Sequence, residues 1–147
     1  SEKILRDMEA DEREDVTDLL EYQENTAGGR MTTDFIALDD TATAAAAIAA
    51  LRGYEGQVES VTTVFLLNSE RQLAGMVPIA RIALAAPASA LRTMAEDPIW
   101  VERGRGEREV AEVFNKYNLL ALPVVDDQRR LLGVVTVDDV IAWLSEG

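Results

Sequence analysis

Apolar positions along the chain fall into short continuous runs and into longer runs with helical spacing. Short apolar runs bounded by turn residues predict strands, and spacings of three and four predict helices. The predicted strands are 35–38, 63–67, 73–77, 98–101, 122–125 and 131–135, and the predicted helices are 43–52, 79–84, 107–117 and 137–144. After residue 30 the order of elements is therefore β-α-β-β-α, twice.

The second half of this pattern also repeats the first half in sequence. Residues 31–38 resemble residues 94–101 at an offset of 63, and residues 65–77 resemble residues 123–135 at an offset of 58. The five-residue difference predicts an insertion in the first copy, within residues 53–63. A three-stranded sheet with two helices on one face leaves its other face apolar and open, so we expect the two copies to pack against each other.

The first 24 residues form a separate, acidic lead-in. They hold ten acidic and three basic residues, a net charge of −7 out of −13 for the whole chain. Their apolar residues have helical spacing and predict one or two short amphipathic helices. Residues 25–29, with paired glycines, are expected to break any helix. The predicted organisation is a lead-in and linker (1–30), a first repeat (31–93) and a second repeat (94–147).

Composition narrows the possible functions. The 147 residues include no cysteine and no histidine. Thiolate and histidine catalysis and the usual structural zinc sites are therefore excluded, and we expect no enzymatic activity. The charge of −13 argues against a nucleic-acid or membrane-surface partner and favours a hard cation such as Mg²⁺. The longest apolar stretches, 41–51 and 79–91, fall short of the roughly 20 residues of a membrane span, so no direct membrane insertion is expected.

The second repeat carries a family resemblance. Residues 122–126, LPVVD, and residues 131–140, LLGVVTVDDV, resemble the second half of a CBS (cystathionine beta-synthase) domain. Together the copies, residues 31–145, resemble a CBS pair, or Bateman module. The resemblance implies an α/β (α+β) fold with two repeats related by a pseudo-two-fold axis. It also implies a regulatory module that forms a homodimer through the CBS helices and binds an adenosine nucleotide (ATP, ADP or AMP) between the copies.

The lead-in adds a narrower resemblance. Residues 15–22, DVTDLLEY, and residues 25–33, NTAGGRMTT, are similar to the junction in MgtE-type magnesium transporters, where an acidic helical domain leads into a CBS pair. This resemblance implies a cytoplasmic regulatory region, followed by the transmembrane portion of the same polypeptide, whose acidic surfaces are brought together by Mg²⁺. The alternative is a soluble CBS-pair protein that senses an adenosine nucleotide and regulates an attached or partner enzyme.

The CBS resemblance implies nucleotide-binding residues in the second repeat. Asp139 would accept hydrogen bonds from ribose hydroxyls, and the Thr136 hydroxyl would face phosphate oxygens beside the free N–H groups of the following helix. The residues expected near the adenine are Ile99, Trp100 and Ala121. Thr136 fits an N-cap equally well, with Asp139 in the first helical turn.

The first repeat departs from this pattern. The aligned positions are Pro78 and Arg81, which offer neither the hydroxyl nor the carboxylate, so we expect at most one nucleotide per pair.

Carboxylates supply the candidate Mg²⁺ ligands, which are Asp15, Asp18, Asp138 and Asp139. Mg²⁺ keeps several waters and often needs only one or two carboxylates, so sites between acidic faces are reasonable; a solvated helix face is the alternative for each residue. Residues 103–108, RGRGER, carry arginines where the resembled transporters carry acids, which argues against metal there. These arginines can meet phosphate, a partner carboxylate or solvent. Trp143 is compatible with a dimer contact or with the core.

Overall fold

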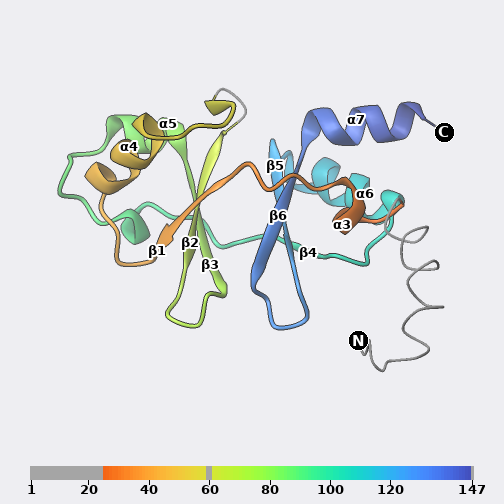
Figure 1. Cartoon of the computed structure of the whole chain (residues 1–147), viewed down its shortest axis with the longest axis horizontal. Coiled ribbons are helices and arrows are strands. Elements are labelled where there is room, and N and C mark those ends of the chain that lie inside the picture. Colours follow the sequence, from red (N-terminus) through yellow and green to blue (C-terminus); the bar gives the residue numbers. More distant parts are fainter. Residues whose placement is uncertain (1–24, 59–60, 147) are drawn as a thin grey trace.

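The structure, a computed structural model, describes residues 25–58 and 61–146 (Figure 1). The predicted lead-in helices, Asp15 and Asp18 lie outside the described residues. Within them, the predicted order β-α-β-β-α occurs twice, so the predicted α/β fold of two repeats is confirmed.

The two repeats have sheets of identical topology. In the first repeat, β1 (Ile36–Asp39), β2 (Thr63–Leu67) and β3 (Leu73–Pro78) form a sheet of order β1-β2-β3. The second repeat has the order β4-β5-β6, with β4 (Val101–Glu102), β5 (Ala121–Val125) and β6 (Leu131–Thr136). In each sheet the first pair of strands is parallel and the second is antiparallel.

The helices lie outside the paired sheets. Figure 1 shows α4 (Ala44–Arg52) and α5 (Ile79–Leu84) on the outer side of the first sheet, and α6 (Glu107–Tyr117) and α7 (Val137–Ser145) on the outer side of the second. A short 3₁₀ helix, η2 (Leu91–Thr93), precedes β4. Among the described helices, none has both the length and the apolar character required to span a membrane.

Apolar packing joins the two repeats, as expected from the open face of each sheet. One buried cluster is centred on each repeat, and Ala27 joins that of the second. A third cluster draws on both repeats: Phe65, Leu73, Met76, Ala121, Val125 and Val134. Phe65 and Leu73 come from β2 and β3, whereas Ala121 and Val134 come from β5 and β6. The sheets therefore share a core.

Two single-residue β-bridges link a segment of one repeat to a strand of the other. Thr32, just before the first sheet, pairs with Val134 in β6, and Glu96, just before the second sheet, pairs with Met76 in β3. Each bridge has two backbone hydrogen bonds, of 2.8 and 2.9 Å at Thr32 and of 2.8 and 3.2 Å at Glu96. The segment that precedes each sheet thus extends the sheet of the other repeat.

Two sequence predictions were wrong in detail. The strand predicted at 98–101 begins only at Val101, because Pro98 has no amide hydrogen and the Ile99 amide donates to Met76 Sδ at 3.5 Å. Residues 25–29 were expected to exclude helix, yet α3 spans Ala27–Arg30. Backbone contacts with the loop before α6 and the side chain of Thr26, which caps α3 by accepting from Gly29 N at 3.3 Å, compensate for the two glycines.

Candidate functional site

Thr136 and Asp139 meet at the start of α7. The Thr136 hydroxyl accepts from Asp139 N at 3.2 Å, and the Asp139 carboxylate accepts from Thr136 N at 3.3 Å. This reciprocal pair is a capping box, which satisfies two backbone donors at the end of the helix. The capping role predicted for Thr136 is confirmed, while its nucleotide-binding role stays a prediction.

Thr136 also lines a narrow pocket between the repeats. Its walls come from both halves of the chain: Asp34, Phe35, Val61, Thr62, Thr63, Phe65, Ala121, Val134 and Thr136. Two of the predicted nucleotide residues, Thr136 and Ala121, are therefore brought together. Asp34 and Phe35 were missed by sequence reasoning, which considered only the repeat that carries the motif. The internal repeat offered one signal that the first repeat also contributes to the pocket. Thr63, which lines it, is the counterpart of Ala121 at the offset of 58.

Tyr54 extends the polar edge of this pocket. Its hydroxyl donates to Asp34 Oδ1 at 3.4 Å. Burial and the neighbouring Asp34 carboxylate raise the pKa of Tyr54 above its ordinary value, so the phenol stays protonated at neutral pH and keeps its donor. Tyr54 follows α4, within the stretch where the sequence predicts the insertion.

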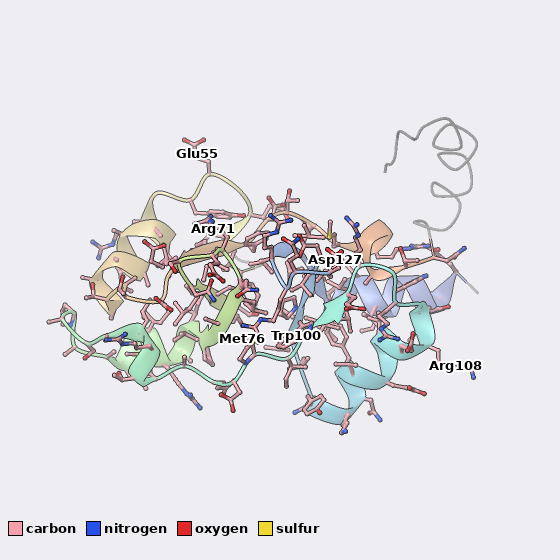
Figure 2. The ribbon with its side chains drawn as sticks, turned by 90° about the horizontal axis from the view of Figure 1, so that it is seen from below. Glu55, Arg71, Met76, Trp100, Arg108 and Asp127 are labelled. Carbon is pink, nitrogen blue, oxygen red and sulfur yellow. The ribbon has the colours of Figure 1, made fainter. Side chains whose placement is uncertain are left out.

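The other two predicted adenine contacts lie elsewhere. Ile99 packs, partly buried, against the core of the second repeat. Trp100 is 36% exposed and lines a separate hollow with Glu102 and Arg105, and the Arg129 guanidinium lies 5.3 Å from its ring centroid. Figure 2 shows Trp100 near Met76 in the middle of the molecule. The structure thus separates Trp100 from the pocket of Thr136.

In the first repeat, Arg81 binds its own chain. Its guanidinium donates to Met94 O at 2.9 Å and pairs with Glu96 Oε2 at 3.1 Å. Pro78 precedes α5 without a side-chain cap. The position aligned with Asp139 is therefore a cation engaged with the segment that joins the repeats, which agrees with the expectation that this half does not hold ribose in the usual way.

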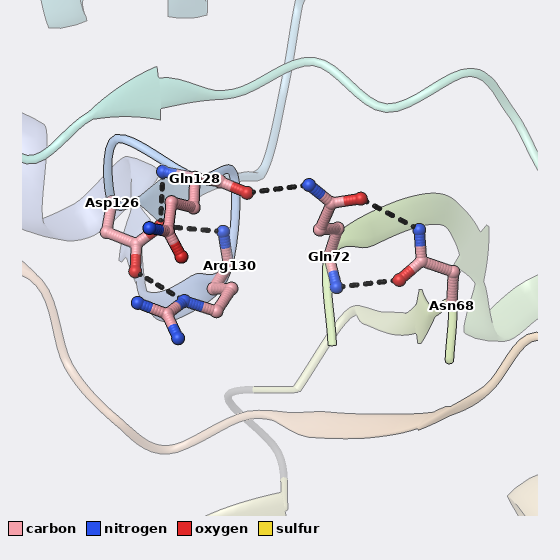
Figure 3. A network of polar contacts seen from close by, with 5 residues as sticks. All are labelled: Asn68, Gln72, Asp126, Gln128 and Arg130. Carbon is pink, nitrogen blue, oxygen red and sulfur yellow. Dashed lines mark hydrogen bonds and ion pairs between the residues drawn. The ribbon is translucent and has the colours of Figure 1, made fainter. Parts of the chain in front are cut away.

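A polar network joins the two hairpin turns (Figure 3). Asn68 Oδ1 accepts from Glu70 N and Gln72 N, both at 2.9 Å, and Asp126 Oδ1 accepts from Gln128 N and Arg130 N at the same distance. The Gln72 side chain then donates to Gln128 O at 2.9 Å. Equivalent residues build equivalent turns, and Gln72 ties one turn to the other.

Asp126 is the charged member of this network. It is 8% exposed, and Arg130 Nε donates to its Oδ2 at 2.9 Å. Burial by itself would raise the pKa of Asp126, but the amides of Arg130 and Gln128 and the Arg130 guanidinium outweigh it and hold the pKa below its ordinary value. Asp126 is thus ionised at neutral pH and stabilises the turn by accepting these hydrogen bonds.

The described carboxylates offer Mg²⁺ only a partial set of ligands. Asp138 is exposed, and the Asp139 carboxylate is engaged in the capping box. Within residues 25–58 and 61–146, no three or more acidic, histidine or cysteine side chains are grouped closely enough to hold a metal ion. One or two carboxylates fit Mg²⁺ that keeps most of its waters, and do not fit a closed protein cage.

Comparison with known proteins identifies the fold. The family model of the CBS domain matches residues 88–146. The magnesium transporter MgtE of Enterococcus faecalis is 30% identical over 138 residues, which cover 93% of this chain and 30% of that protein. MgtE of Thermus thermophilus is 30% identical over 134 residues, 90% of this chain and 30% of that protein. The chain thus spans under a third of the length of these relatives.

Solved structures agree with this assignment. The soluble part of a magnesium transporter superposes with a TM-score of 0.80 at 29% identity, over 89% of this chain and 52% of that one. The cytosolic domain of the Mg²⁺ channel MgtE in complex with ATP gives 0.77 at 28% identity, over 81% of this chain and 48% of that one. The chain is therefore a tandem pair of CBS domains that resembles the cytosolic part of MgtE-type magnesium transporters.

Proposed function

We propose that this chain is the cytoplasmic regulatory CBS pair of a magnesium transporter and that it gates transport in response to Mg²⁺ and an adenosine nucleotide. The observation that carries this proposal is the similarity to MgtE over nine-tenths of the chain, from the acidic lead-in through both repeats. Residues 1–30 are the proposed end of a helical domain, 31–93 and 94–147 the two repeats, and the transmembrane portion of the same polypeptide the proposed partner.

The proposed nucleotide site is centred on the pocket between the repeats, whose free volume of about 10 Å³ has room for one water, so nucleotide binding requires the walls of the pocket to move apart. Thr136 and Ala121 enter it from the second repeat and Asp34 and Phe35 from the first, so one ligand would touch both halves. A ring such as Phe35 supplies a stacking surface for a base, and Asp139 at the adjoining helix start supplies a ribose acceptor. The ATP complex of a similar CBS pair supports the choice of ligand.

Calorimetry tests the nucleotide site. ATP, ADP, AMP and S-adenosylmethionine are titrated into the wild type and into Asp139→Ala, without Mg²⁺. The control Asp138→Ala removes the same charge one position earlier, at an exposed residue outside the capping box. Because a hydrogen bond from ribose to a carboxylate is lost, nucleotide binding is expected to weaken about tenfold in Asp139→Ala and to stay unchanged in Asp138→Ala. No heat with any nucleotide would reject the site, and equal weakening in both variants would point to general electrostatics.

The proposed Mg²⁺ response rests on charge. The lead-in has a net charge of −7, and the proposed ligands Asp15 and Asp18 lie within it. Asp138 and Asp139 are the proposed ligands of the second repeat. Repulsion between like charges raises the free energy of a compact arrangement, and a cation that binds between the acidic surfaces favours closure by its differential affinity.

Limited proteolysis tests the Mg²⁺ response. Trypsin can cleave the lead-in after Lys3, Arg6 and Arg13. Mg²⁺ on the order of 10 mM, the range suited to weak carboxylate sites, is expected to slow this cleavage and raise the melting temperature. Sodium chloride at matched ionic strength is the control, and the double variant Asp15→Asn/Asp18→Asn is expected to lose the protection. Identical digestion in Mg²⁺ and in chelator would contradict the proposal.

A homodimer through the CBS helices is also proposed. Ile141 is 57% exposed and Leu144 51% exposed on α7, and Leu144 borders a hollow between α6 and α7. Such apolar exposure on a helix pair suits a second copy of the chain. Trp143, by contrast, is 2% exposed and belongs to the core. Ile141→Glu is expected to give monomers in sedimentation, whereas Leu120→Glu, at a residue 60% exposed outside the helices, is the matched control.

The coding sequence that follows residue 147 distinguishes the transporter from the nucleotide-sensing alternative. Hydrophobic spans encoded after Gly147 are expected for the transporter. An enzyme domain there, together with nucleotide heat, would favour the nucleotide-sensing alternative.

A further inference from the structure

Arg30 joins the two places where the chain enters and leaves the CBS pair. It is the last residue of α3, and Glu146 follows the last residue of α7. Arg30 Nη1 donates to Glu146 Oε2 at 2.7 Å, and Arg30 Nη2 donates to Oε1 at 2.5 Å. This two-pronged geometry fixes direction as well as distance, which a single ion pair does not.

The Arg30 guanidinium also packs on a buried ring. It lies 5.2 Å from the centroid of Trp143, which is 2% exposed, and the Arg30 side chain is itself only 24% exposed. Most surface ion pairs add little because both side chains are mobile and solvated. Stacking on Trp143 removes most of that freedom from Arg30, whereas Glu146 is 55% exposed. In the pair of Arg81 and Glu96 both side chains are half exposed.

The end of α7 needs a cation that its own sequence lacks. Its last turn contains no basic residue, while its first turn contains Asp138 and Asp139. A positive charge near the last carbonyls of a helix is stabilising. Arg30, far away in sequence, places a guanidinium beside this end of the helix through Glu146 and Trp143.

α3 is in turn held by the loop before α6. Ala27 N donates to Arg105 O at 2.8 Å, and Gly28 N donates to Arg103 O at 2.9 Å. A Cβ atom at Gly28 would lie 3.2 Å from the Arg103 carbonyl oxygen, so this approach depends on a residue without a side chain. The position of Arg30 is therefore set by the seat of α3 on residues 103–105.

We propose that Arg30 is a clamp that couples the seat of α3 to the last turn of α7. With α3 seated, Glu146 and Trp143 hold Arg30 and the end of α7 is ordered. When α3 leaves residues 103–105, Arg30 withdraws and the end of α7 loosens. Whatever displaces the segment before α3 is thereby transmitted to the residue at which the chain leaves the second repeat.

Hydrogen exchange on the full chain tests the clamp. Arg30→Met keeps an apolar contact with Trp143 and removes the charge, and Glu146→Gln removes the partner charge. Each is expected to speed exchange of the Ser145 and Glu146 amides about fivefold. The double variant is expected to exchange about as fast as Arg30→Met, because Arg30→Met already removes the partner of Glu146. Arg81→Met removes the pair between Arg81 and Glu96 in the segment that joins the repeats, and it is the control, with exchange in α7 unchanged.

Displacing α3 tests the coupling itself. Gly28→Val is expected to speed exchange at residues 27–30 and also at the end of α7, and the second effect is expected to vanish in the Arg30→Met background. Faster exchange in α3 with an unchanged end of α7 would overturn the proposal. So would unchanged exchange in Arg30→Met and Glu146→Gln, which alter only one side chain at the edge of the pair.

Discussion

Gly133 lies where the two repeats exchange chain, and replacing it with alanine tests that exchange. A Cβ atom at Gly133 would lie 2.7 Å from Met31 Sδ and 2.8 Å from the Thr32 carbonyl oxygen. The Met31 side chain can turn away. The Thr32 oxygen is held because it accepts from Val134 N at 2.9 Å, so the backbone of one segment must shift.

The cost follows from what the shift breaks. Two backbone bonds join Thr32 to Val134, each of which contributes about 1 kcal/mol net. Overpacking adds roughly 1–3 kcal/mol, so we expect Gly133→Ala to lower the free energy of unfolding by about 3–5 kcal/mol. No described glycine has a positive φ, so the strain is steric and the effect of alanine on the unfolded chain is shared with other glycines.

The first repeat provides a matched control at Gly75. A Cβ atom there would meet only side-chain atoms, Ala95 Cβ at 3.2 Å and Leu66 Cδ1 at 3.5 Å. We therefore expect a cost of about 1 kcal/mol, the low end of the overpacking range. Urea unfolding followed by circular dichroism measures both variants, provided that the slope against urea is unchanged. The reasoning is refuted if Gly75→Ala destabilises as much as Gly133→Ala.

Three further predictions concern single side chains. Because the pKa of Asp126 is lowered, its carboxylate stabilises the fold above about pH 4, and this contribution is lost as the pH falls through the lowered pKa. Asp126→Asn is expected to reduce the loss of stability at acid pH, measured by urea unfolding at several pH values. Thr136→Ala is expected to cost about 1 kcal/mol in thermal unfolding through loss of the cap on α7, whereas exposed Asp138→Ala leaves the melting temperature nearly unchanged. Arg81→Gln is expected to cost less than about 0.5 kcal/mol, because both partners are half exposed; a larger loss would contradict the surface placement of the pair.

Elements with a strong local signal were predictable from the sequence. The helices Ile79–Leu84 and Glu107–Tyr117 and the strand Thr63–Leu67 have the predicted limits. Their apolar spacing or continuous burial is a property of consecutive residues, so it is readable without tertiary contacts. The capping role of Thr136 was readable for the same reason, because its partner is three residues away.

Features that depend on distant residues were not predictable. The bridges at Thr32 and Glu96 involve single residues and leave no periodic pattern. α3 contains two glycines and forms because distant carbonyl groups receive its amides. At the pocket, Ala121 and Thr136 came from the resemblance to CBS domains, but Phe35 belongs to the other repeat and only the folded chain brings it there.

The exchanged bridges imply that one repeat by itself is an incomplete folding unit. If the chain were cut at the predicted boundary after residue 93, the second half would lack Thr32 at the edge of β6. The first half would lack Glu96 at the edge of β3. Two separate copies could restore these pairings only by associating. Because the repeats share these bridges and a core, the pair is expected to unfold in one cooperative transition.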